Sequence, residues 1–390
     1  MLPNGWNTYH IAEILERISI PVKPVDGVNY REIGIRSHGK GIFHKENTTA
    51  ENIGNKRVFE IVPNALVLNI VFAWEQAVAR ISNDEQGFIA SHRFPQFLPK
   101  NNLCDIDYLL YFFKTLKGKY LLNLASPGGA GRNKTLGQKE FENLALLLPP
   151  TVEQRKIVNI LSTWDKAIST TEQLMDNTKQ QKKALTQQVL TGRKRFPRFN
   201  IEWREEKLKD CIDSLDNKRV PLNSTQRKKM AGNIPYWGAN GIVGYVNDYL
   251  FNETIVLLAE DGGYFEKYQN RSIANISYGK SWVNNHAHIL RAKSSLSNEW
   301  LYYSLVHKNI LGFINGGTRA KLNKSDMLNI FIKIPCKDEQ KSLVRTFQNI
   351  DKEIGLLEQQ LADLKQEKKA LMQQLLTGKR RVQIKEMEVA

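Results

Sequence analysis

The sequence has few cysteines, no long apolar run and fewer acidic than basic residues. Its three cysteines, Cys104, Cys211 and Cys336, lie far apart and without CxxC spacing, which excludes a disulfide framework and a cysteine zinc site. We expect buried free thiols instead. The longest apolar stretch, ALVLNIVFAW at residues 65–74, is too short to span a bilayer and is interrupted by Asn69. It therefore predicts a core strand.

The start of the sequence has no apolar run that resembles a signal peptide. Together with the unpaired cysteines, this predicts a reducing, cytoplasmic setting and no membrane partner. The 390 residues are 41% hydrophobic and 25% charged, which is typical of an ordinary soluble protein of two or three domains.

The charge balance is strongly basic. Lysine and arginine total 56 against 40 acidic residues, which gives a formal net charge of +16. A cationic surface gains affinity for a polyanion by releasing condensed counterions, so this excess favours a nucleic-acid partner. A basic protein that is merely soluble is the alternative that composition leaves open.

One segment occurs twice in the chain. EQRKIVNILSTWDKAI, from Glu153, returns as EQKSLVRTFQNIDKEI from Glu339, 186 residues later. At the same offset KKALTQQVLTG, from Lys182, returns as KKALMQQLLTG from Lys368. The unchanged offset indicates an internal duplication.

Both copies have the heptad pattern of a long amphipathic helix. Apolar residues alternate at spacings of four and three with no internal proline. The first copy is the weaker, because Thr171, Thr178 and Lys182 stand at seam positions. Each helix is predicted to end at a glycine, Gly192 or Gly378, which can take the left-handed cap conformation. The residues expected to pair the helices are Leu161, Trp164, Ile168, Leu185, Phe347, Ile350, Ile354, Leu361 and Leu371.

A helix of about 40 residues is a rod of roughly 60 Å and cannot bury its apolar stripe alone. Two copies in one chain can bury their stripes against each other. An antiparallel pair would relate the two halves of the chain by a pseudo-twofold axis, and we predict this arrangement over a parallel one. Recruitment of helices from another subunit is compatible with either.

The segments before the two helices are faintly alike. GRNKTLGQKEFENLALLLP aligns with GTRAKLNKSDMLNIFIKIP at the same offset, and the starts GWNTYHIAEIL and EWREEKLKDCI are similar, whereas the interiors differ. Short β-branched and aromatic runs separated by Gly, Asn and Pro predict strand-rich α+β domains of one fold with two different surfaces. The predicted organisation is a globular domain at 1–148, a helix at 149–195, a globular domain at 196–334, a helix at 335–381 and a tail at 382–390.

Basic, glycine-rich loops are the candidate nucleic-acid-contacting elements. Glycine lets the backbone approach phosphates, arginine and lysine can bind guanine, and asparagine can bind adenine. Solvated turns, and core positions for the aromatic residues, are the alternatives. The candidates are Arg36, Ser37, His38 and Lys40 in EIGIRSHGKGIF; Arg132, Asn133 and Lys134 in SPGGAGRNK; Tyr236, Trp237 and Asn240 in YWGANG; and Arg319 and Lys321 in NGGTRAK.

No motif predicts catalysis by this chain. The only Pro-Pro pair, at residues 149–150, lacks the flanking residues of an adenine methyltransferase tetrad, and no phosphate-binding glycine loop is present. His286 and His288 alternate as on a strand, and no third metal ligand at suitable spacing accompanies them. Glu260 and Asp261 are the nearest candidates for nuclease chemistry. We expect no catalytic residues, no metal site and no cofactor bound by this chain.

The repeated segments and loops give the chain a family resemblance. The motifs are the paired P-x(2–3)-EQ…D-K-x-I…KKAL-x-QQ-x-L-TG segments, YREIGIRSHGKGIFHKE from Tyr30, IPYWGANGIVGYV from Ile234 and LLAEDGGYF from Leu257. With them the chain resembles the specificity subunit of a type I restriction-modification system over essentially its whole length.

The resemblance implies a division of labour between subunits. Each globular part would be a target-recognition domain that reads one half of a bipartite, asymmetric sequence in double-stranded DNA. The helices would set the spacing and dock two methyltransferase (M) subunits, and restriction/translocase (R) subunits would join the full complex. S-adenosylmethionine for DNA methylation would be bound by the methyltransferase, and ATP and Mg by the nuclease/translocase.

Two other classes of function compete with this one. A coiled-coil adaptor that binds only proteins explains the helices but neither the charge of +16 nor the two divergent globular parts. An autonomous modification enzyme lacks the required motifs.

Overall fold

The computed structural model of the chain describes residues 3–128, 134–316 and 320–383. It divides into two compact units, residues 1–172 with 359–390 and residues 173–358. Each unit contains one globular part and half of each of two long helices. We call the globular part before the first long helix the first head, and the one between the two long helices the second head.

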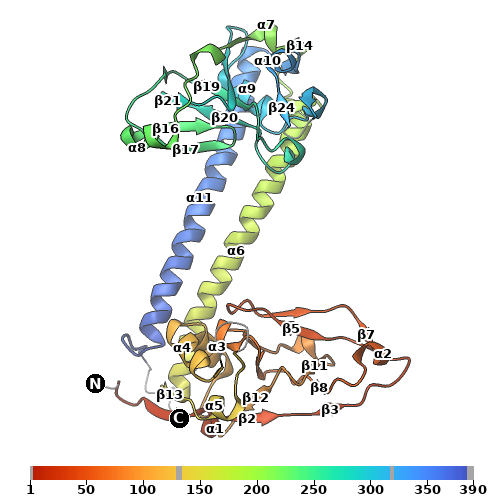
Figure 1. The fold of residues 1–390 in the computed structure, drawn as a ribbon, viewed down its shortest axis with the longest axis vertical. Coiled ribbons are helices and arrows are strands. Elements are labelled where there is room, and N and C mark those ends of the chain that lie inside the picture. Colours follow the sequence, from red (N-terminus) through yellow and green to blue (C-terminus); the bar gives the residue numbers. More distant parts are fainter. Residues whose placement is uncertain (1–2, 129–133, 317–319, 384–390) are drawn as a thin grey trace. The chain divides into compact units, whose positions relative to one another are not determined.

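The long helices are α6 (Thr151–Leu190) and α11 (Lys337–Leu375), each an unbroken helix in Figure 1. The chain leaves each of them through a glycine in the left-handed region, with φ of +77° at Gly192 and +72° at Gly378. The predicted helices and their glycine ends are confirmed.

The first head is built from short strands and helices. Its strands are β1 (Asn7–His10), β2 (Leu15–Ile18), β3 (Pro21–Val22), β4 (Asn29–Tyr30), β5 (Ile33–Ile35), β6 (Ile42–His44), β7 (Thr48–Thr49), β8 (Val58–Glu60), β9 (Leu66–Leu68), β10 (Val78–Arg80), β11 (Ile89–Ser91), β12 (Gln96–Pro99) and β13 (Ala145–Leu148). Its helices are α1 (Ile11–Ile14), α2 (Ala50–Ile53), α3 (Ile106–Phe113), α4 (Leu116–Leu124) and α5 (Gln138–Glu142), with short 3-10 turns η1 (Ala73–Glu75) and η2 (Asn83–Glu85).

Two small sheets, with orders β10-β9-β12-β2 and β11-β8-β3, form the centre of the first head. Its main core joins head residues such as Phe97 and Phe113 to Ile157 and Leu161 of α6 and to Leu375 of α11. The ends of both long helices are thus part of this core, because their apolar stripes continue into it.

The second head has longer strands. They are β14 (Arg204–Lys207), β15 (Ile212–Ser214), β16 (Ala231–Gly238), β17 (Gly241–Val246), β18 (Phe251–Asn252), β19 (Ile255–Ala259), β20 (Ala274–Ser277), β21 (Lys280–Val283), β22 (Ala287–Ala292), β23 (Ile314–Asn315), β24 (Lys321–Leu322) and β25 (Phe331–Ile334). The helices are α7 (Leu208–Cys211), α8 (Ser224–Lys229), α9 (Asn298–Leu305) and α10 (Lys324–Met327), with 3-10 turns η4 (Asp216–Lys218), η5 (Phe265–Lys267) and η6 (Leu311–Phe313).

Two four-stranded sheets, β15-β22-β19-β20 and β17-β16-β21-β18, organise the second head. Strand β19 is buried at every position, as its continuous apolar sequence predicts. The core around Trp300 also contains Val189 of α6 and Leu343 and Phe347 of α11. The second head is therefore joined to the long helices in the same way as the first.

The two heads begin and end alike. The order β1, α1, β2 at the start of the first head is repeated as β14, α7, β15 in the second. The first strand of each head pairs antiparallel with its last strand, β1 with β13 and β14 with β25, directly before a long helix. The predicted common fold is confirmed in these shared elements.

A buried glutamine ties each head to its helix. The Gln154 side chain donates to the carbonyls of Pro149 (2.8 Å) and Leu103 (3.0 Å) and accepts from the amide of Asp105 (2.8 Å). Gln340 makes the same three kinds of bond in the second unit. Each head therefore has a fixed attachment to the first turn of its helix.

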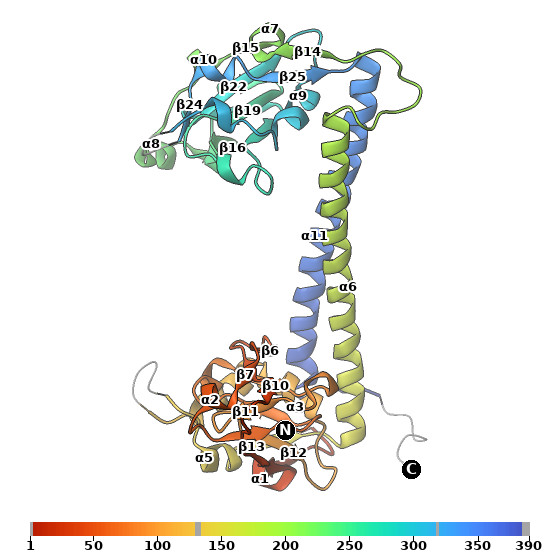
Figure 2. The same ribbon diagram turned by 90° about the vertical axis from the view of Figure 1, so that its right-hand side faces the viewer.

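The long helices are antiparallel within each unit, and they lie side by side in both views (Figure 1, Figure 2). In the first unit the helices are joined by the ion pairs Asp165–Lys368 and Glu172–Lys365, and Arg381, in the segment after α11, pairs with Glu153 of α6. In the second unit the helices are joined by Asp351–Lys182 and Glu358–Lys179, and Arg195, in the segment after α6, pairs with Glu339 of α11. Each pair of the second unit is the pair of the first at the 186-residue offset, as a pseudo-twofold relation requires.

The predicted seam lies at the interface of the helices. All nine residues expected to pair them are buried or half-buried, while most residues between them are exposed. Thr171 and Thr178 are buried there as well. Lys182, the other departure from an apolar seam, reaches Asp351. The tertiary structure thus explains a lysine at a position where the pattern alone expects an apolar residue.

The predictions of a strand at residues 65–74 and of buried cysteine thiols are each confirmed only in part. The strand predicted for residues 65–74 ends at Leu68, because Asn69 turns the chain by accepting the Val71 amide on its side chain at 3.1 Å. Cys104 and Cys211 are buried free thiols, and burial raises their pKa values to about 12 and about 11. Cys336 is only half-buried.

Candidate nucleic-acid interface

The first predicted loop of the first head is the turn of the β5–β6 hairpin. Arg36 is exposed, donates to the Ile42 carbonyl at 3.0 Å, and lies over the Phe43 ring at 4.8 Å. That ring fits because Gly34 lies beneath it, where a β-carbon would collide. His38 takes a positive φ of 62°, which helps to form the tight turn that exposes it.

This hairpin is held on a second turn of the same head. The Ser37 hydroxyl donates to the Glu75 carboxylate at 3.0 Å, and the His38 amide donates to the Glu75 carbonyl at 2.7 Å. The side-chain amide of Gln76 then donates to the Phe113 carbonyl at 2.8 Å. The loop is therefore anchored through backbone and side-chain bonds, while Lys40 stays exposed.

The second predicted loop of this head reaches the same place. Arg132 and Asn133 lie outside the described residues. Lys134 donates to the Asn123 side chain of α4 at 2.8 Å and lies 5.5 Å from the centre of the Trp74 ring in η1. Both loops thus meet at η1, although about a hundred residues separate them in the sequence.

In the second head, three loops from distant parts of the chain converge. Asn240, at the tip of the β16–β17 hairpin, donates to the Gly262 carbonyl at 2.8 Å. Lys321 forms an ion pair with Glu260 at 3.2 Å, and the Leu322 amide donates to the Glu260 carbonyl at 2.8 Å. Arg319 lies outside the described residues.

The prediction for Tyr236 is wrong. Its ring is 2% exposed, and its hydroxyl accepts from the Leu222 amide at 2.9 Å, so it offers no surface to a ligand. Strand β16 extends through Gly238, and its alternation turns Tyr236 into a core around Val246. Trp237 is half-buried against the core that contains Leu215.

A buried ionic network supports the convergent loops. His288 is 1% exposed and has an acceptor at each ring nitrogen, the Asp216 carboxylate on Nδ1 at 2.7 Å and the Leu322 carbonyl on Nε2 at 2.9 Å. Because a carbonyl can only accept, Nε2 donates to Leu322, and Nδ1 faces the Asp216 carboxylate. Arg219 pairs with both Asp216 and Glu260, which balances the second carboxylate.

His286 and His288 thus have separate partners. His286 contacts Asp261 at 2.6 Å near the surface, whereas His288 holds the start of the loop that contains Lys321. Within the ranges that the structure describes, no three His, Cys, Asp or Glu side chains are arranged to hold a metal ion. Glu260 pairs with Arg219 and Lys321, and Nδ1 of His288 lies 3.7 Å from its carboxylate.

The sequence analysis did not predict the exposed lysines of α4 and α8, which lie beside these loops. In the first head, Lys117 and Lys119 are exposed on α4, which packs on the same turn η1 that holds the β5–β6 hairpin. In the second, α8 carries exposed Lys228 and Lys229 and packs near β17. The lysine clusters LKGK and RKK are visible in the sequence, but they carry no turn signal that sets them apart from ordinary exposed helix faces.

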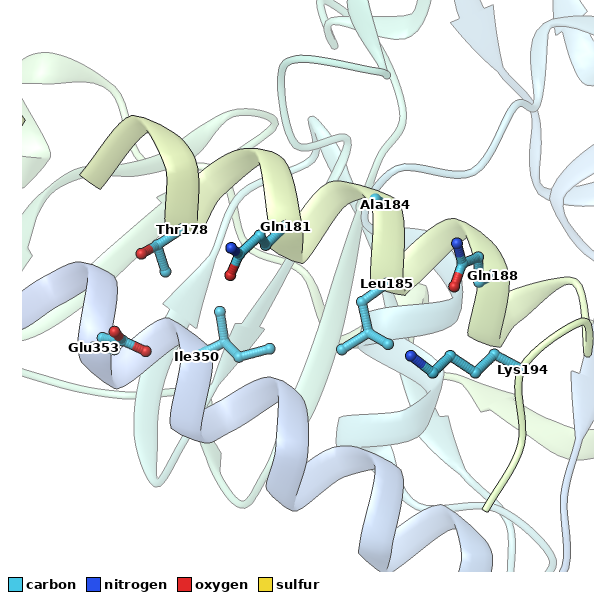
Figure 3. Close-up of a pocket in the computed structure, with 8 residues that line it drawn as sticks. All are labelled: Thr178, Gln181, Ala184, Leu185, Gln188, Lys194, Ile350 and Glu353. Atoms are coloured by element: carbon cyan, nitrogen blue, oxygen red, sulfur yellow. The ribbon is translucent and has the colours of Figure 1, made fainter. Parts of the chain in front are cut away.

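The long helices carry grooves of their own. Figure 3 shows one in the second unit, where Leu185 of α6 and Ile350 of α11 point toward each other and Lys194 extends alongside. A neighbouring groove is lined by Leu185, Val189, Lys194, Arg195, Phe196, Leu343, Thr346 and Phe347. The first unit has a groove lined by Lys156, Ile160, Leu371, Leu375, Arg380, Arg381, Val382 and Gln383. Six lining positions of this first-unit groove correspond, at the 186-residue offset, to six lining positions of the second-unit groove that contains Phe196.

Comparison with known proteins gives a consistent result. The family model of the type I restriction modification DNA specificity domain matches residues 3–180 and 200–366. The type I restriction enzyme MjaVIII specificity subunit of Methanocaldococcus jannaschii is 24% identical over 98% of this chain and 94% of its own length. No helix among the described residues is long and apolar enough to cross a membrane.

Two solved structures share the fold. The type I restriction-modification system S subunit from M. genitalium matches with a TM-score of 0.63 and 14% identity, over 99% of this chain and 100% of that one. The HsdS subunit from Thermoanaerobacter tengcongensis matches with a TM-score of 0.53 and 18% identity, over 97% and 98%.

The buried network predicts an acid dependence of stability. Burial raises the pKa of Asp216, but hydrogen bonds from His288 and the Ile289 amide and the charges of His288 and Arg219 outweigh it, so the pKa lies below its usual value. A lowered folded pKa contributes stability above the unfolded value of about 3.9, and this contribution is lost as the pH falls through the folded pKa. Asp216→Asn should cost about 2–4 kcal/mol at neutral pH, and its deficit relative to the wild type should shrink below about pH 4.

Urea unfolding followed by tryptophan fluorescence at several pH values measures this deficit. The exposed Asp210→Asn is the matched control and should follow the wild type throughout. A deficit for Asp216→Asn that stays constant from pH 6 to pH 3 would contradict the assignment.

Proposed function

Since the chain belongs to the type I restriction modification DNA specificity family, we propose that its two heads read the two halves of a bipartite, asymmetric DNA target. The family supplies the DNA sequence specificity of type I restriction-modification systems, with DNA and the methyltransferase and restriction subunits as its general partners. The proposal adds that the long helices set the distance between the half-sites and dock two methyltransferase subunits.

The proposal rests on one observation, namely that the attachments between heads and helices are duplicated whereas the loops of the candidate interface are not. The ion pairs between the helices, the buried glutamines and the terminal strand pairs all occur twice. The loops of the candidate interface differ between the heads. Duplicated attachment suits two identical partners, and different loops suit two different half-sites.

The charge of the interface favours DNA. Arg36, Lys40 and Lys117 are exposed in the first head, as are Lys228 and Lys321 in the second. Each cation that neutralises a phosphate releases a condensed counterion, so affinity should fall steeply with salt. An adaptor that binds only proteins has no need of this arrangement.

The two corresponding grooves on the helices support two docking sites. Each combines aliphatic side chains with arginine, such as Leu185 and Arg195 in the second unit and Leu371 and Arg381 in the first. An amphipathic helix of a partner can bury its apolar face in such a groove. We infer that this chain is not catalytic, and that the methyltransferase binds S-adenosylmethionine while the nuclease/translocase binds ATP and Mg.

Exchanging one head tests the assignment of half-sites. Replacing residues 5–148 by the first head of another family member should change one half of the methylated sequence and keep the other, because each head would read independently. Mapping of methylated adenines in cells with either version measures this. A change in both halves would contradict independent reading.

Shortening the helices tests whether they set the spacing. Deleting residues 171–177 together with 357–363 keeps the heptad register and shortens the pair by roughly 10 Å. The unread spacer should shrink by about three base pairs at about 3.4 Å each, with both half-sites kept. The deletions remove two exposed ion pairs, worth about 0.5 kcal/mol each, and keep the aspartate–lysine pairs.

The matched control deletes seven residues from α6 alone, which mismatches the two seams and should destabilise the protein instead. Methylation maps again provide the measurement. Kept half-sites with an unchanged spacer would refute the role of the helices as a ruler.

Charge placed in the grooves tests methyltransferase docking. Ile160→Glu in the first unit, or its equivalent Thr346→Glu in the second, should reduce the bound methyltransferase subunits from two to one, because a carboxylate opposes burial of an apolar face. Thr163→Glu and Asn349→Glu, which are exposed equivalents outside the grooves, should leave two bound. Native mass spectrometry counts the subunits, and two copies on the double variant Ile160→Glu/Thr346→Glu would rule the grooves out.

A further inference from the structure

Helix α4 of the first head presents an unusual apolar stripe to solvent. Leu116, Tyr120 and Leu124 are 77%, 64% and 59% exposed, and their spacing of four places them on one face of the helix. Apolar side chains scattered singly on a surface need no explanation, but a row of three large ones marks an interaction surface. The residues that fix α4 to the head lie on the other face.

The helix is rigidly held. Thr115 caps it by accepting the Gly118 amide on its hydroxyl at 3.0 Å. Gly118 packs so closely on the end of α3 that a β-carbon there would collide with the Phe112 backbone. Leu122, on the same inner face, is fully buried. The stripe is therefore presented by a fixed element and not by a mobile loop.

The stripe is continuous with the candidate nucleic-acid interface. The side-chain amide of Gln76, whose backbone holds the β5–β6 hairpin, donates to the carbonyl of Thr115 at 3.2 Å, directly before α4. Lys134 donates to Asn123 near the other end of the helix. The helix thus lies between the two loops predicted to contact DNA.

The charges on α4 itself have one sign. Lys117 and Lys119 are exposed on either side of it, and α4 contains no acidic residue. A cationic border suits a partner that carries phosphates. The apolar side chains between the lysines suit base and sugar edges, above all the methyl group of thymine.

Among the residues of the second head that the structure describes, this helix has no counterpart. Helices α3 and α9 correspond, because Tyr111 and Tyr303 donate to the equivalent aspartates Asp165 (2.6 Å) and Asp351 (2.7 Å). After α3 the chain enters α4, whereas after α9 the described residues pass through a turn into the short η6. A surface for the duplicated partner would occur twice, so a surface that occurs once belongs to what differs between the heads.

From these observations we propose that α4 is the base-reading helix of the first head. Leu116, Tyr120 and Leu124 contact bases and sugars of one half-site, and Lys117 and Lys119 contact the flanking phosphates. A helix can enter the major groove of B-DNA, whose width accepts it. The inference rests on the proposed function, since it names the residues through which the first head reads its half-site.

The test measures binding of the complex with its methyltransferase subunits to three duplexes. They are the target found by methylation mapping, a duplex with the first half-site scrambled and a duplex with the second half-site scrambled. Tyr120→Ala and Leu116→Ala should each weaken binding to the target on the order of tenfold and reduce its preference over the first scrambled duplex, because base contacts are lost. Preference over the second scrambled duplex should not change.

A second pair of variants distinguishes contacts to the bases from contacts to the phosphates. Lys117→Ala and Lys119→Ala should weaken binding to all three duplexes alike and reduce the slope of log affinity against log salt by about 0.9 each. Val25→Ala, at another exposed apolar position of the same head, is the matched control and should behave as the wild type. Thermal unfolding of each variant confirms that the head is folded.

The outcomes are distinguishable. A wild-type complex that does not discriminate the first scrambled duplex refutes the proposed function itself. If the wild type discriminates and Tyr120→Ala and Leu116→Ala do so equally well, only the role of α4 is overturned. Loss of methyltransferase subunits from these variants, with the half-site preference kept, would overturn it as well and would make α4 a protein-docking surface.

Discussion

A lysine on the seam of each long helix reaches an aspartate of the other, and this contact determines how the two helices are aligned. Lys368 meets Asp165 in the first unit, and Lys182 meets Asp351 in the second. A slip of one heptad would keep apolar residues in register but would move each lysine roughly 10 Å from its aspartate. Polar groups on an otherwise apolar seam thereby specify one alignment among several that the apolar pattern allows.

The heads depend on the same contact. Tyr111 of α3 donates to Asp165, and Tyr303 of α9 donates to Asp351, so each aspartate joins both helices and one head. Burial and the bond to the aspartate raise the pKa of both tyrosines, which keeps them as donors. A head is therefore attached at the site where the helix alignment is set, and the attachment is the same in both units.

Each head presents its loops by different means. The first stacks Arg36 on an aromatic ring and holds its hairpin through backbone bonds to one turn. The second places a buried histidine, His288, beneath its convergent loops and pairs two carboxylates with Arg219. A duplicated framework can tolerate this divergence because the loops lie outside the shared cores, and the proposed reading of two different half-sites would require this property.

Much of the fold could be predicted from the sequence, because the signals involved are local or periodic. The heptad pattern of α6 and α11, their glycine ends and the unchanged offset between the copies all follow from residue spacing, and spacing is set by helix geometry. The basic glycine loops could also be predicted, because glycine favours turns and its spacing among lysine and arginine is visible in the sequence.

What only the tertiary structure decided concerns pairs of residues far apart in the chain. Tyr236 is a core residue because β16 extends past it. The lysine at seam position 182 is explained only by its ion pair with Asp351 of the other helix. The exposure of Leu116 on α4 likewise follows from the face on which Gly118 packs. The sequence by itself determined which elements form, because hydrogen bonding along a helix or within a turn is local. Which side chains face solvent, and which loops meet, depends on packing between segments that no local pattern encodes.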